Sequence, residues 1–444
     1  MRSLFVALTA AFRKTVPTWF ALFLLHCDAT GPADVTVPVV DGVITSVDGY
    51  AVFVPGDTLR VTLGASDDNQ LAYLGYILSG PTDVFDTARV AEQTATRNIE
   101  IPIHPEWVGV VELSVFAVDA QGNSASAIVD TIDVVDAVRR SMVSVLLPGL
   151  VYDVAWDSVR GRLYLSLPSR NEIAVLDLRT QTLRTPIEVP GSPWGLDLTL
   201  GSDSLVVALR DTPHLAMVNL EGGAVDLVHL GIPPNDFNLG PANVRVLANG
   251  KALVSITFDG FGFGGEVREF DFATGASQIR MDAGLGSKHI ALTRSNDRQR
   301  LLLQDVDTCC TWPAVIYGAA TDSFDVRRDA LKRTTSATLS ADARGTRFLI
   351  DDSVFDALLN FIVTLEPVGY EYGASVITPN GIDAYMATYR AYVKVRIPHS
   401  VPLERVLVPL TPERLWLSPD GRTLVATTPD PPTSTSTLWL IPES

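Results

Sequence analysis

The stretch SPDGRTLVAT, residues 418–427, decides the fold of this 444-residue chain because six other segments repeat its pattern. Each segment places a turn rich in Gly, Asp or Asn directly before an apolar strand. The others are SVRGRLYLSL (158–167), GSDSLVVAL (201–209), LANGKALVSI (247–256), RSNDRQRLLLQ (294–304), SADARGTRFLI (340–350) and TPNGIDAYMA (378–387). Their first strand residues recur every 37 to 48 positions, at Leu163, Leu205, Leu253, Leu301, Phe348, Tyr385 and Leu424. Repeats of that length built from β-hairpins are typical of propeller blades.

Further strands flank each turn, so the pattern predicts four antiparallel strands per blade and a seven-bladed β-propeller over residues 138–444. A strand precedes every turn, a third follows most of them, and a fourth follows in several blades, as in RVLVPL (405–410). The seventh blade stops one strand short at the end of the sequence. The unassigned strand MVSVLL, residues 142–147, is expected to complete it and close the ring, which removes open sheet edges.

The blades resemble YVTN-type and lactonase-like seven-bladed propellers. The repeated SPDGRTLVAT-like hairpin and the IAVLDL-like third strand (173–178) carry this resemblance over about 300 residues. It implies the fold but no single activity, because this architecture hosts binding proteins, enzymes and scaffolds.

Residues 37–137 show strands every 8 to 20 residues with turn punctuation, which predicts a β-sandwich. The spacing of SDDN (66–69), the alternating strand VELSVFAVD (111–119) and the turn DAQGN (119–123) resemble bacterial immunoglobulin-like domains. The resemblance implies a spacer or adhesion module. The chain is therefore expected to be all-β, with an Ig-like sandwich followed by the propeller.

Residues 1–27 resemble a bacterial lipoprotein signal. Arg13 and Lys14 precede the apolar run 16–25, which is the length of a signal-peptide core, and Cys27 follows it. His26 departs from that family, which has a small residue before the cysteine. Lipidation of Cys27 is the favoured expectation, with simple secretion or an uncleaved anchor as alternatives. Residues 28–36 then form a tether, and we expect export to a bacterial cell envelope, in a periplasmic or surface-exposed position.

The net charge of −17 opposes nucleic-acid binding, which needs Lys and Arg to neutralise phosphates. Membrane contact is expected only through the N-terminal lipid or signal anchor.

Ligand sites in propellers lie where the loops entering the innermost strands converge. Aromatic and charged residues in those loops would suit a sugar, peptide or carboxylate. The alternative is that they only cap and hydrate the channel. The candidates are Trp194, Lys288, His289, Arg333, Tyr370, Tyr372 and Arg414.

Lactonase-type propellers use channel carboxylates and a histidine, in some cases with a metal. His289 is the histidine expected at an inner-strand entrance, and Asp153 and Glu371 are the carboxylates that could accompany it. These residues do not match that family's motif one by one, so its catalytic assignments are not transferred. A single histidine is more often structural than catalytic.

Cys309 and Cys310 are adjacent in the loop between the second and third strands of blade four. In an exported protein they could form a strained vicinal disulfide, or remain two partly buried thiols. Adjacent thiolates rarely bind one tetrahedral ion, so this pair predicts no zinc site.

Two hypotheses follow. The favoured one is an exported, non-enzymatic binding or scaffold protein that recognises a protein, glycan or small molecule through the propeller face, with no cofactor. The alternative is a lactonase-like hydrolase with a divalent metal or a histidine–carboxylate centre in the channel.

Overall fold

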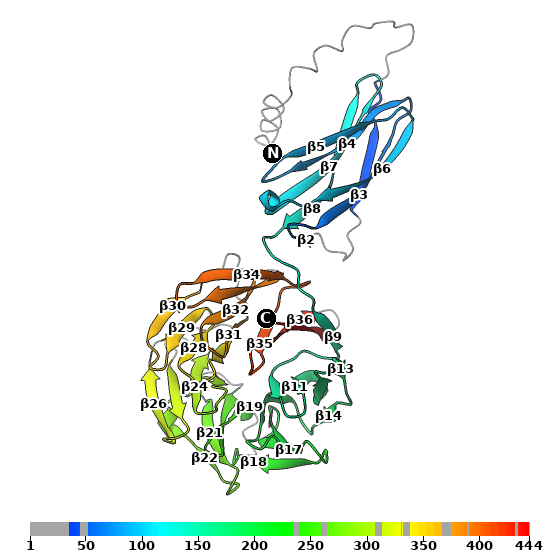
Figure 1. Cartoon of the computed structure of the whole chain (residues 1–444). Helices are drawn as coiled ribbons and strands as arrows, with labels where there is room; N and C mark the ends of the chain where they lie inside the picture. Colours follow the sequence, from blue (N-terminus) through cyan, green and yellow to red (C-terminus); the bar gives the residue numbers. More distant parts are fainter. Residues whose placement is uncertain are drawn as a thin grey trace, which may run out of the picture. The chain divides into compact units, whose positions relative to one another are not determined.

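A computed structural model shows the chain as two compact units, residues 1–135 and 136–444 (Figure 1). It describes residues 35–44, 52–233, 239–258, 264–306, 313–329, 331, 338–365, 374–388, 390–430 and 434–443. Regular structure in these ranges is nearly all β-strand, with three short 3-10 helices at Pro105–Trp107, Pro168–Arg170 and Met281–Ala283. None of the described helices is long and apolar enough to cross a membrane.

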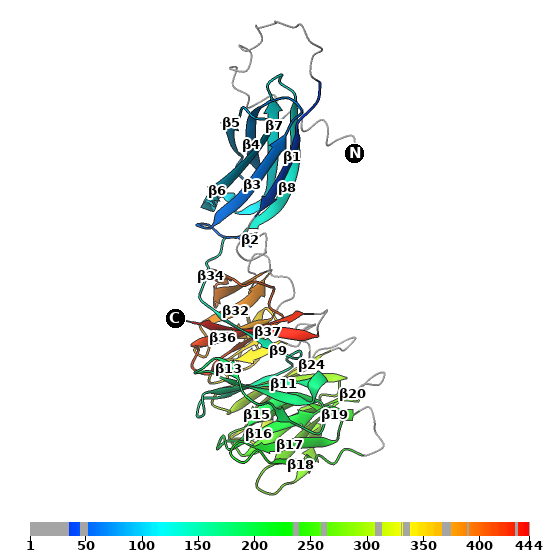
Figure 2. The ribbon, with the colours of Figure 1, turned by 90° about the vertical axis from the view of Figure 1, so that its right-hand side faces the viewer.

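The first unit is a sandwich of two β-sheets (Figure 2). One sheet has the order β1 (Val39–Ile44), β3 (Thr58–Ser66), β6 (Thr94–Pro102). The other has the order β2 (Val52–Phe53), β8 (Ser124–Val134), β7 (Gly109–Asp119), β4 (Leu71–Ser79), β5 (Val84–Arg89). All pairings are antiparallel except β2 with β8.

The sequence alternation of this unit places its apolar side chains between the two sheets. Leu59, Val61 and Leu63 of β3 share one buried core with Leu113 and Val115 of β7. The intervening residues of these strands are less buried, as the two-residue period of a strand requires.

The second unit contains seven sheets in sequence order, each with four or five strands. The first three sheets contain β10 (Val154–Asp157), β11 (Arg162–Leu167), β12 (Glu172–Asp177), β13 (Thr182–Leu183) and β14 (Ile187–Glu188); β15 (Pro193–Leu198), β16 (Ser204–Leu209), β17 (His214–Asn219) and β18 (Val225–His229); β19 (Leu239–Val246), β20 (Lys251–Phe258), β21 (Glu266–Asp271) and β22 (Ser277–Ile279).

The remaining four sheets contain β23 (His289–Arg294), β24 (Arg300–Val306), β25 (Ala314–Gly318) and β26 (Ser323–Arg328); β27 (Leu339–Ala341), β28 (Arg347–Ile350), β29 (Ser353–Asp356) and β30 (Phe361–Thr364); β31 (Ser375–Ile377), β32 (Asp383–Thr388), β33 (Ala391–Arg396) and β34 (Val401–Leu407); β35 (Arg414–Leu417), β36 (Thr423–Asp430), β37 (Thr435–Pro442) and β9 (Val143–Leu147).

These sheets are the blades of a closed ring, and we number them one to seven in the order given. Passing from blade one to blade seven, the first strands of neighbouring blades contact one another, so these strands surround the ring axis. Apolar layers fill the space between neighbouring blades. Blade one packs on blade two through Tyr164 and Leu205, and on blade seven through Leu165 and Leu438. The propeller expected from the repeat is confirmed.

The strand before the first blade completes the last one. β9 pairs antiparallel with β37, with Leu147 opposite Ser436 and Val143 opposite Leu440. Val145 and Leu147 are buried in the core between blades one and seven, whereas Leu146 is exposed. The two ends of the ring are thus joined by β-pairing as well as by a shared core.

The hairpin between the first and second strands of each blade contains a residue with a left-handed backbone, which explains why glycine recurs in this turn. Glycine occupies this position in five blades, with positive φ at Gly161, Gly250, Gly345, Gly381 and Gly421. Glycine adopts that conformation without the steric cost that other residues bear. Blade two has Ser202 there (φ 56°) and blade four has Arg298 (φ 60°).

Candidate functional site: the central channel

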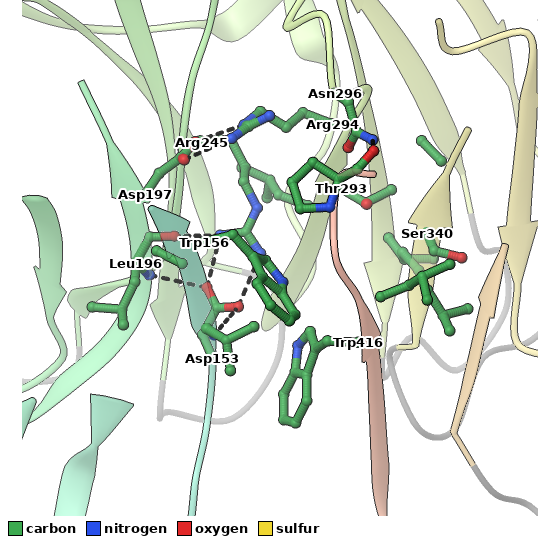
Figure 3. A pocket seen from close by; sticks show the side chains of 18 of the residues that line it. Asp153, Trp156, Leu196, Asp197, Arg245, Thr293, Arg294, Asn296, Ser340 and Trp416 are labelled. Carbon is green, nitrogen blue, oxygen red and sulfur yellow. Dashed lines mark hydrogen bonds and ion pairs between the residues drawn. The ribbon is translucent and has the colours of Figure 1, made fainter. Parts of the chain in front are cut away.

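A cavity of about 420 Å³ lies on the axis of the ring (Figure 3). Its lining includes residues from the innermost strand of all seven blades. A volume of this size lies within the roughly 300–1,000 Å³ of small-molecule pockets.

Asp153, directly before β10, forms a buried ion pair with Arg245 of β19, two blades away. Arg245 Nη1 donates to Asp153 Oδ2 at 2.7 Å and Nη2 donates to Oδ1 at 3.3 Å. The backbone N–H of Leu196 donates to Oδ2 and that of Val154 to Oδ1. Burial opposes the charge of Arg245, but Asp153 outweighs it and raises the pKa of the guanidinium above its usual range. Both carboxylate oxygens of Asp153 are therefore engaged.

Asp197 of β15 is held in the same manner by Arg294 of β23, again two blades away. Arg294 Nε donates to Oδ2 at 2.7 Å and Nη2 to Oδ1 at 2.8 Å, while the N–H of Val246 donates to Oδ2. Burial alone would raise the pKa of Asp197. The charges of Arg294, Arg298 and Arg245, with the hydrogen bonds of Arg294, lower it to about 2.

Arg298 reaches the channel from a backbone position that favours glycine. Its Nη1 donates to the carbonyl oxygen of Leu198 at 2.7 Å, and its Nη2 lies 4.0 Å from Asp197 Oδ1. Burial lowers the pKa of this guanidinium, and the neighbouring charge of Arg294 lowers it further, against the attraction of Asp197. A non-glycine residue in the left-handed region costs about 1–2 kcal/mol, and such strain clusters at functional sites.

The described channel lining carries an excess of positive charge. Its charged residues are four arginines, Arg245, Arg294, Arg298 and Arg414, against two aspartates, Asp153 and Asp197, a net charge of +2. The whole chain has a net charge of −17. A low-dielectric channel of one sign concentrates ligands of the opposite sign.

Arg414 lies at the start of β35 and is fixed by an aromatic stack. Its Nη1 donates to the carbonyl oxygen of Tyr152 at 2.9 Å, and its guanidinium lies 5.0 Å from the centroid of the Tyr152 ring. Tyr152 packs against Trp194 at 4.4 Å between centroids, and Arg210 covers Trp194 at 5.5 Å. Cation–π contacts of this kind hold both arginines in place.

The structure brings only some of the predicted site residues to this cavity. Asp153 and Arg414 line it, and Trp194 supports Arg414 through Tyr152. Lys288 and His289 are not among the lining residues, and the carbonyl of His289 accepts a hydrogen bond from Ser287 Oγ. The remaining predicted residues lie outside the described part of the chain: Cys27, Cys309, Cys310, Arg333, Tyr370, Glu371 and Tyr372.

Sequence reasoning missed Asp197, Arg245, Arg294 and Arg298. A signal was present, since the first three are charged residues inside otherwise apolar innermost strands, in WGLDLTL, ANVRVLA and HIALTRS. A charge on a buried strand needs a partner. The partner could not be identified because each pair joins strands of different blades across the channel.

The described channel carboxylates do not fit a divalent cation. Asp153 and Asp197 each have a guanidinium nitrogen at 2.7 Å, so a cation would have to displace an arginine before it could bind. Among the described residues no group of three or more His, Cys, Asp and Glu side chains is placed to hold a metal ion.

Among the comparisons with known proteins, one solved structure supports the fold. No family model and no curated protein matches the sequence. The β-propeller domain of Cps50 (Swd1) from Myceliophteria thermophila matches with a TM-score of 0.50 and 13% identity, over 66% of this chain and 98% of that one. Two further matches have lower TM-scores. A luciferin-regenerating enzyme gives 0.45 at 13% identity, over 68% and 96% of the two chains. Regucalcin from Agrobacterium tumefaciens, described as a calcium-binding protein, gives 0.44 at 14% identity, over 67% and 93%. At 13% identity, the likeness to the Cps50 (Swd1) domain concerns the β-propeller fold alone.

Proposed function

We propose that this protein is a non-enzymatic binding propeller whose central channel takes a small organic anion. The observation that carries the proposal is the channel charge of +2 in a chain of net charge −17. Asp153 and Asp197 balance Arg245 and Arg294, which leaves Arg298 and Arg414 as the charge in excess. An anion beside Arg298 would relieve its repulsion with Arg294. Guanidinium groups also match the geometry of carboxylates and phosphates.

Isothermal titration calorimetry with acetate, hexanoate and inorganic phosphate tests this proposal. We expect at least one of them to bind, with an affinity that falls as ionic strength rises. Arg298→Gly and Arg414→Gln should each weaken that binding about tenfold or more. Arg298→Gly is the sharper variant, because glycine suits the turn and five other blades have it. Arg60→Gln in the first unit, which removes an exposed ion pair with Glu100, is the control. Absence of binding by every probe at millimolar concentration, or unchanged binding by both channel variants, would refute the proposal.

We further propose that the first unit is an immunoglobulin-like domain. Its strand order supports this. Strands β1, β3 and β6 correspond to A, B and E, and strands β8, β7, β4 and β5 correspond to G, F, C and C′ of that fold. It would serve as a spacer that carries the propeller.

We propose that the chain is exported and lipid-anchored through Cys27, as the sequence of residues 16–27 favours. Metabolic labelling with a radioactive fatty acid in a bacterial host tests this. The wild-type chain should be labelled and Cys27→Ser should not. Label on both chains, or on neither, would contradict a lipid anchor at this cysteine.

A further inference from the structure

The channel has two chemically different walls. The first four blades contribute five of the six charged lining residues: Asp153, Asp197, Arg245, Arg294 and Arg298. The last three blades contribute one charge, Arg414 at the start of β35, and otherwise apolar or hydroxyl side chains. We call the side chains of these three blades other than Arg414 the uncharged wall. Figure 3 shows Asp153 and Arg245 on one side of the cavity and Ser340 on the other.

The hydroxyl groups of the uncharged wall are already used within the ring. Ser340 Oγ accepts the backbone N–H of Ile377 at 2.9 Å. Ser375 Oγ donates to the carbonyl oxygen of Asp351. Thr338 Oγ1 donates to the side-chain carboxylate of the same aspartate at 3.0 Å. Each of these three hydroxyl oxygens therefore has a partner inside the ring.

Two tryptophans lie where the walls meet, at the junction of blades seven and one. Trp156 of β10 and Trp416 of β35 both line the cavity, and both pack against the apolar core shared by these blades. In Figure 3 the two indoles occupy the same part of the cavity. Neither indole N–H donates a hydrogen bond within the described part of the chain. Tryptophan offers a large apolar face and one donor, which suits a ligand with both apolar and polar parts.

We propose that the ligand of this channel is an amphipathic carboxylate. Its carboxylate lies toward Arg414, and its aliphatic or aromatic body lies against the uncharged wall and the indoles of Trp156 and Trp416, the second of which is on the same strand as Arg414. This inference rests on the proposed anion-binding function and names the ligand class of the same site. Small hydrophilic anions make the polar contacts without the apolar ones, so they bind more weakly.

Calorimetry with the full chain and a series of monocarboxylates tests the ligand class. The probes are acetate, butyrate, hexanoate, octanoate, phenylacetate and indole-3-acetate. Affinity should rise about two- to fourfold for each added methylene until the cavity is filled. Hexanoamide, which has the same chain without the charge, should bind at least tenfold more weakly than hexanoate.

The variant Trp416→Leu separates the inference from the proposed function. It should weaken hexanoate binding about tenfold and leave acetate and phosphate binding unchanged, whereas Arg414→Gln should weaken all three. Trp416→Phe keeps the aromatic packing if the leucine variant unfolds, and it should retain the preference for long chains.

Three results would overturn the inference. If acetate, hexanoate and phosphate bind equally and Trp416→Leu has no effect, the channel is an anion site without an apolar subsite, and only the proposed function survives. If hexanoamide binds as well as hexanoate, the ligand is apolar and uncharged, and both proposals fail. Both also fail if no probe binds.

Discussion

Asp197 illustrates how one residue holds several blades of the ring together. It accepts hydrogen bonds from Val246 of blade three and Arg294 of blade four while it belongs to blade two. Removing one partner of a buried ion pair leaves an uncompensated charge, at a cost of roughly 3–5 kcal/mol. We therefore expect Asp197→Asn to lower the free energy of unfolding by about that amount, measured by urea denaturation at pH 7. Asp329→Asn removes a mostly exposed pair with Arg327 and should change it by less than about 1 kcal/mol.

Asp197 also makes the stability of the folded chain depend on pH, and the direction of this dependence follows from its pKa. The pKa of Asp197 is about 2 in the folded chain, below the ordinary value of about 3.9 in an unfolded one. Its contribution to stability is therefore complete above about pH 4 and is lost as the pH falls through 2. The wild-type chain should lose stability across this interval more steeply than Asp197→Asn, in urea titrations at a series of pH values. Parallel pH profiles for the two chains would show that Asp197 is not the titrating group.

Sequence could predict some residues of the site and not others, for a physical reason. Asp153 lies directly before one innermost strand and Arg414 begins another, and the repeat alone indicates that such positions face the ring axis. Arg245 and Arg294 pair with residues 92 and 97 positions earlier in the chain. That pairing depends on how far each blade is rotated about the axis, which no local pattern encodes. Likewise, the sequence around Arg298 is that of an ordinary turn, so it does not indicate that this arginine has a left-handed backbone.

The closing strand β9 is the element on which ring closure depends. Its side chains alternate, so a charge at one position enters the core and a charge at the next position faces solvent. Leu147→Asp places a carboxylate in the core between blades one and seven and should cost about 3 kcal/mol or more. Leu146→Asp on the same strand should change stability by roughly 0.5 kcal/mol or less, because Leu146 is exposed. Thermal melting of both variants checks this, and equal melting temperatures would show that β9 does not hold the ring closed.

The residue after β37 fastens the end of the chain. Tyr385 and Tyr392 donate to the carboxylate oxygens of Glu443 at 2.9 and 2.8 Å, and Arg140 pairs with the same carboxylate at 3.1 Å. Burial, followed by the charge of Glu443, raises the pKa of both tyrosines above the ordinary value of 10.

This arrangement predicts alkaline sensitivity. A raised phenol pKa contributes stability that is present below about pH 10 and is lost as the pH rises further. The double variant Tyr385→Phe/Tyr392→Phe should be less stable at pH 7, by roughly 1–3 kcal/mol for each unsatisfied buried group. It should also lose less additional stability between pH 9 and 11. Urea denaturation over this range measures both effects, and an equally steep alkaline decline in the variant would contradict the assignment.

Strands with many buried residues were predictable, and exposed outer strands were less so. The second strand of each blade is almost entirely buried, as in β16 and β24, and forms a continuous apolar run. The outer strand of blade six was expected at 405–410 and is found at Val401–Leu407, where its first three residues are exposed. Without a buried side to fix the register, the sequence pattern of such a strand is ambiguous.

At the scale of the molecule, each unit has its own apolar core. Among the described residues, one core lies wholly within the first unit and seven lie within the ring. We expect a chain that begins at residue 136 to melt within about 2 °C of the ring transition of the full chain, and to bind hexanoate equally well. Differential scanning calorimetry and titration of both chains measure this. A lower melting temperature or weaker binding for the shorter chain would show that the ring depends on the first unit.

Metal analysis distinguishes a binding propeller from a hydrolase for the molecule as a whole. Asp153 and Asp197 are neutralised by arginines, so a divalent cation would have to break two buried ion pairs to use them. The chain from residue 28 to 444, purified without chelator, should therefore contain less than stoichiometric metal, and EDTA should shift its melting temperature by less than about 1 °C. Elemental analysis with melting curves before and after chelation measures both quantities. A stoichiometric metal together with a chelator-induced fall would place a metal site in the ring, and lactone hydrolysis would then be the activity to assay. If the channel binds an anion as proposed, hexanoate should raise the melting temperature in the presence of EDTA as much as in its absence.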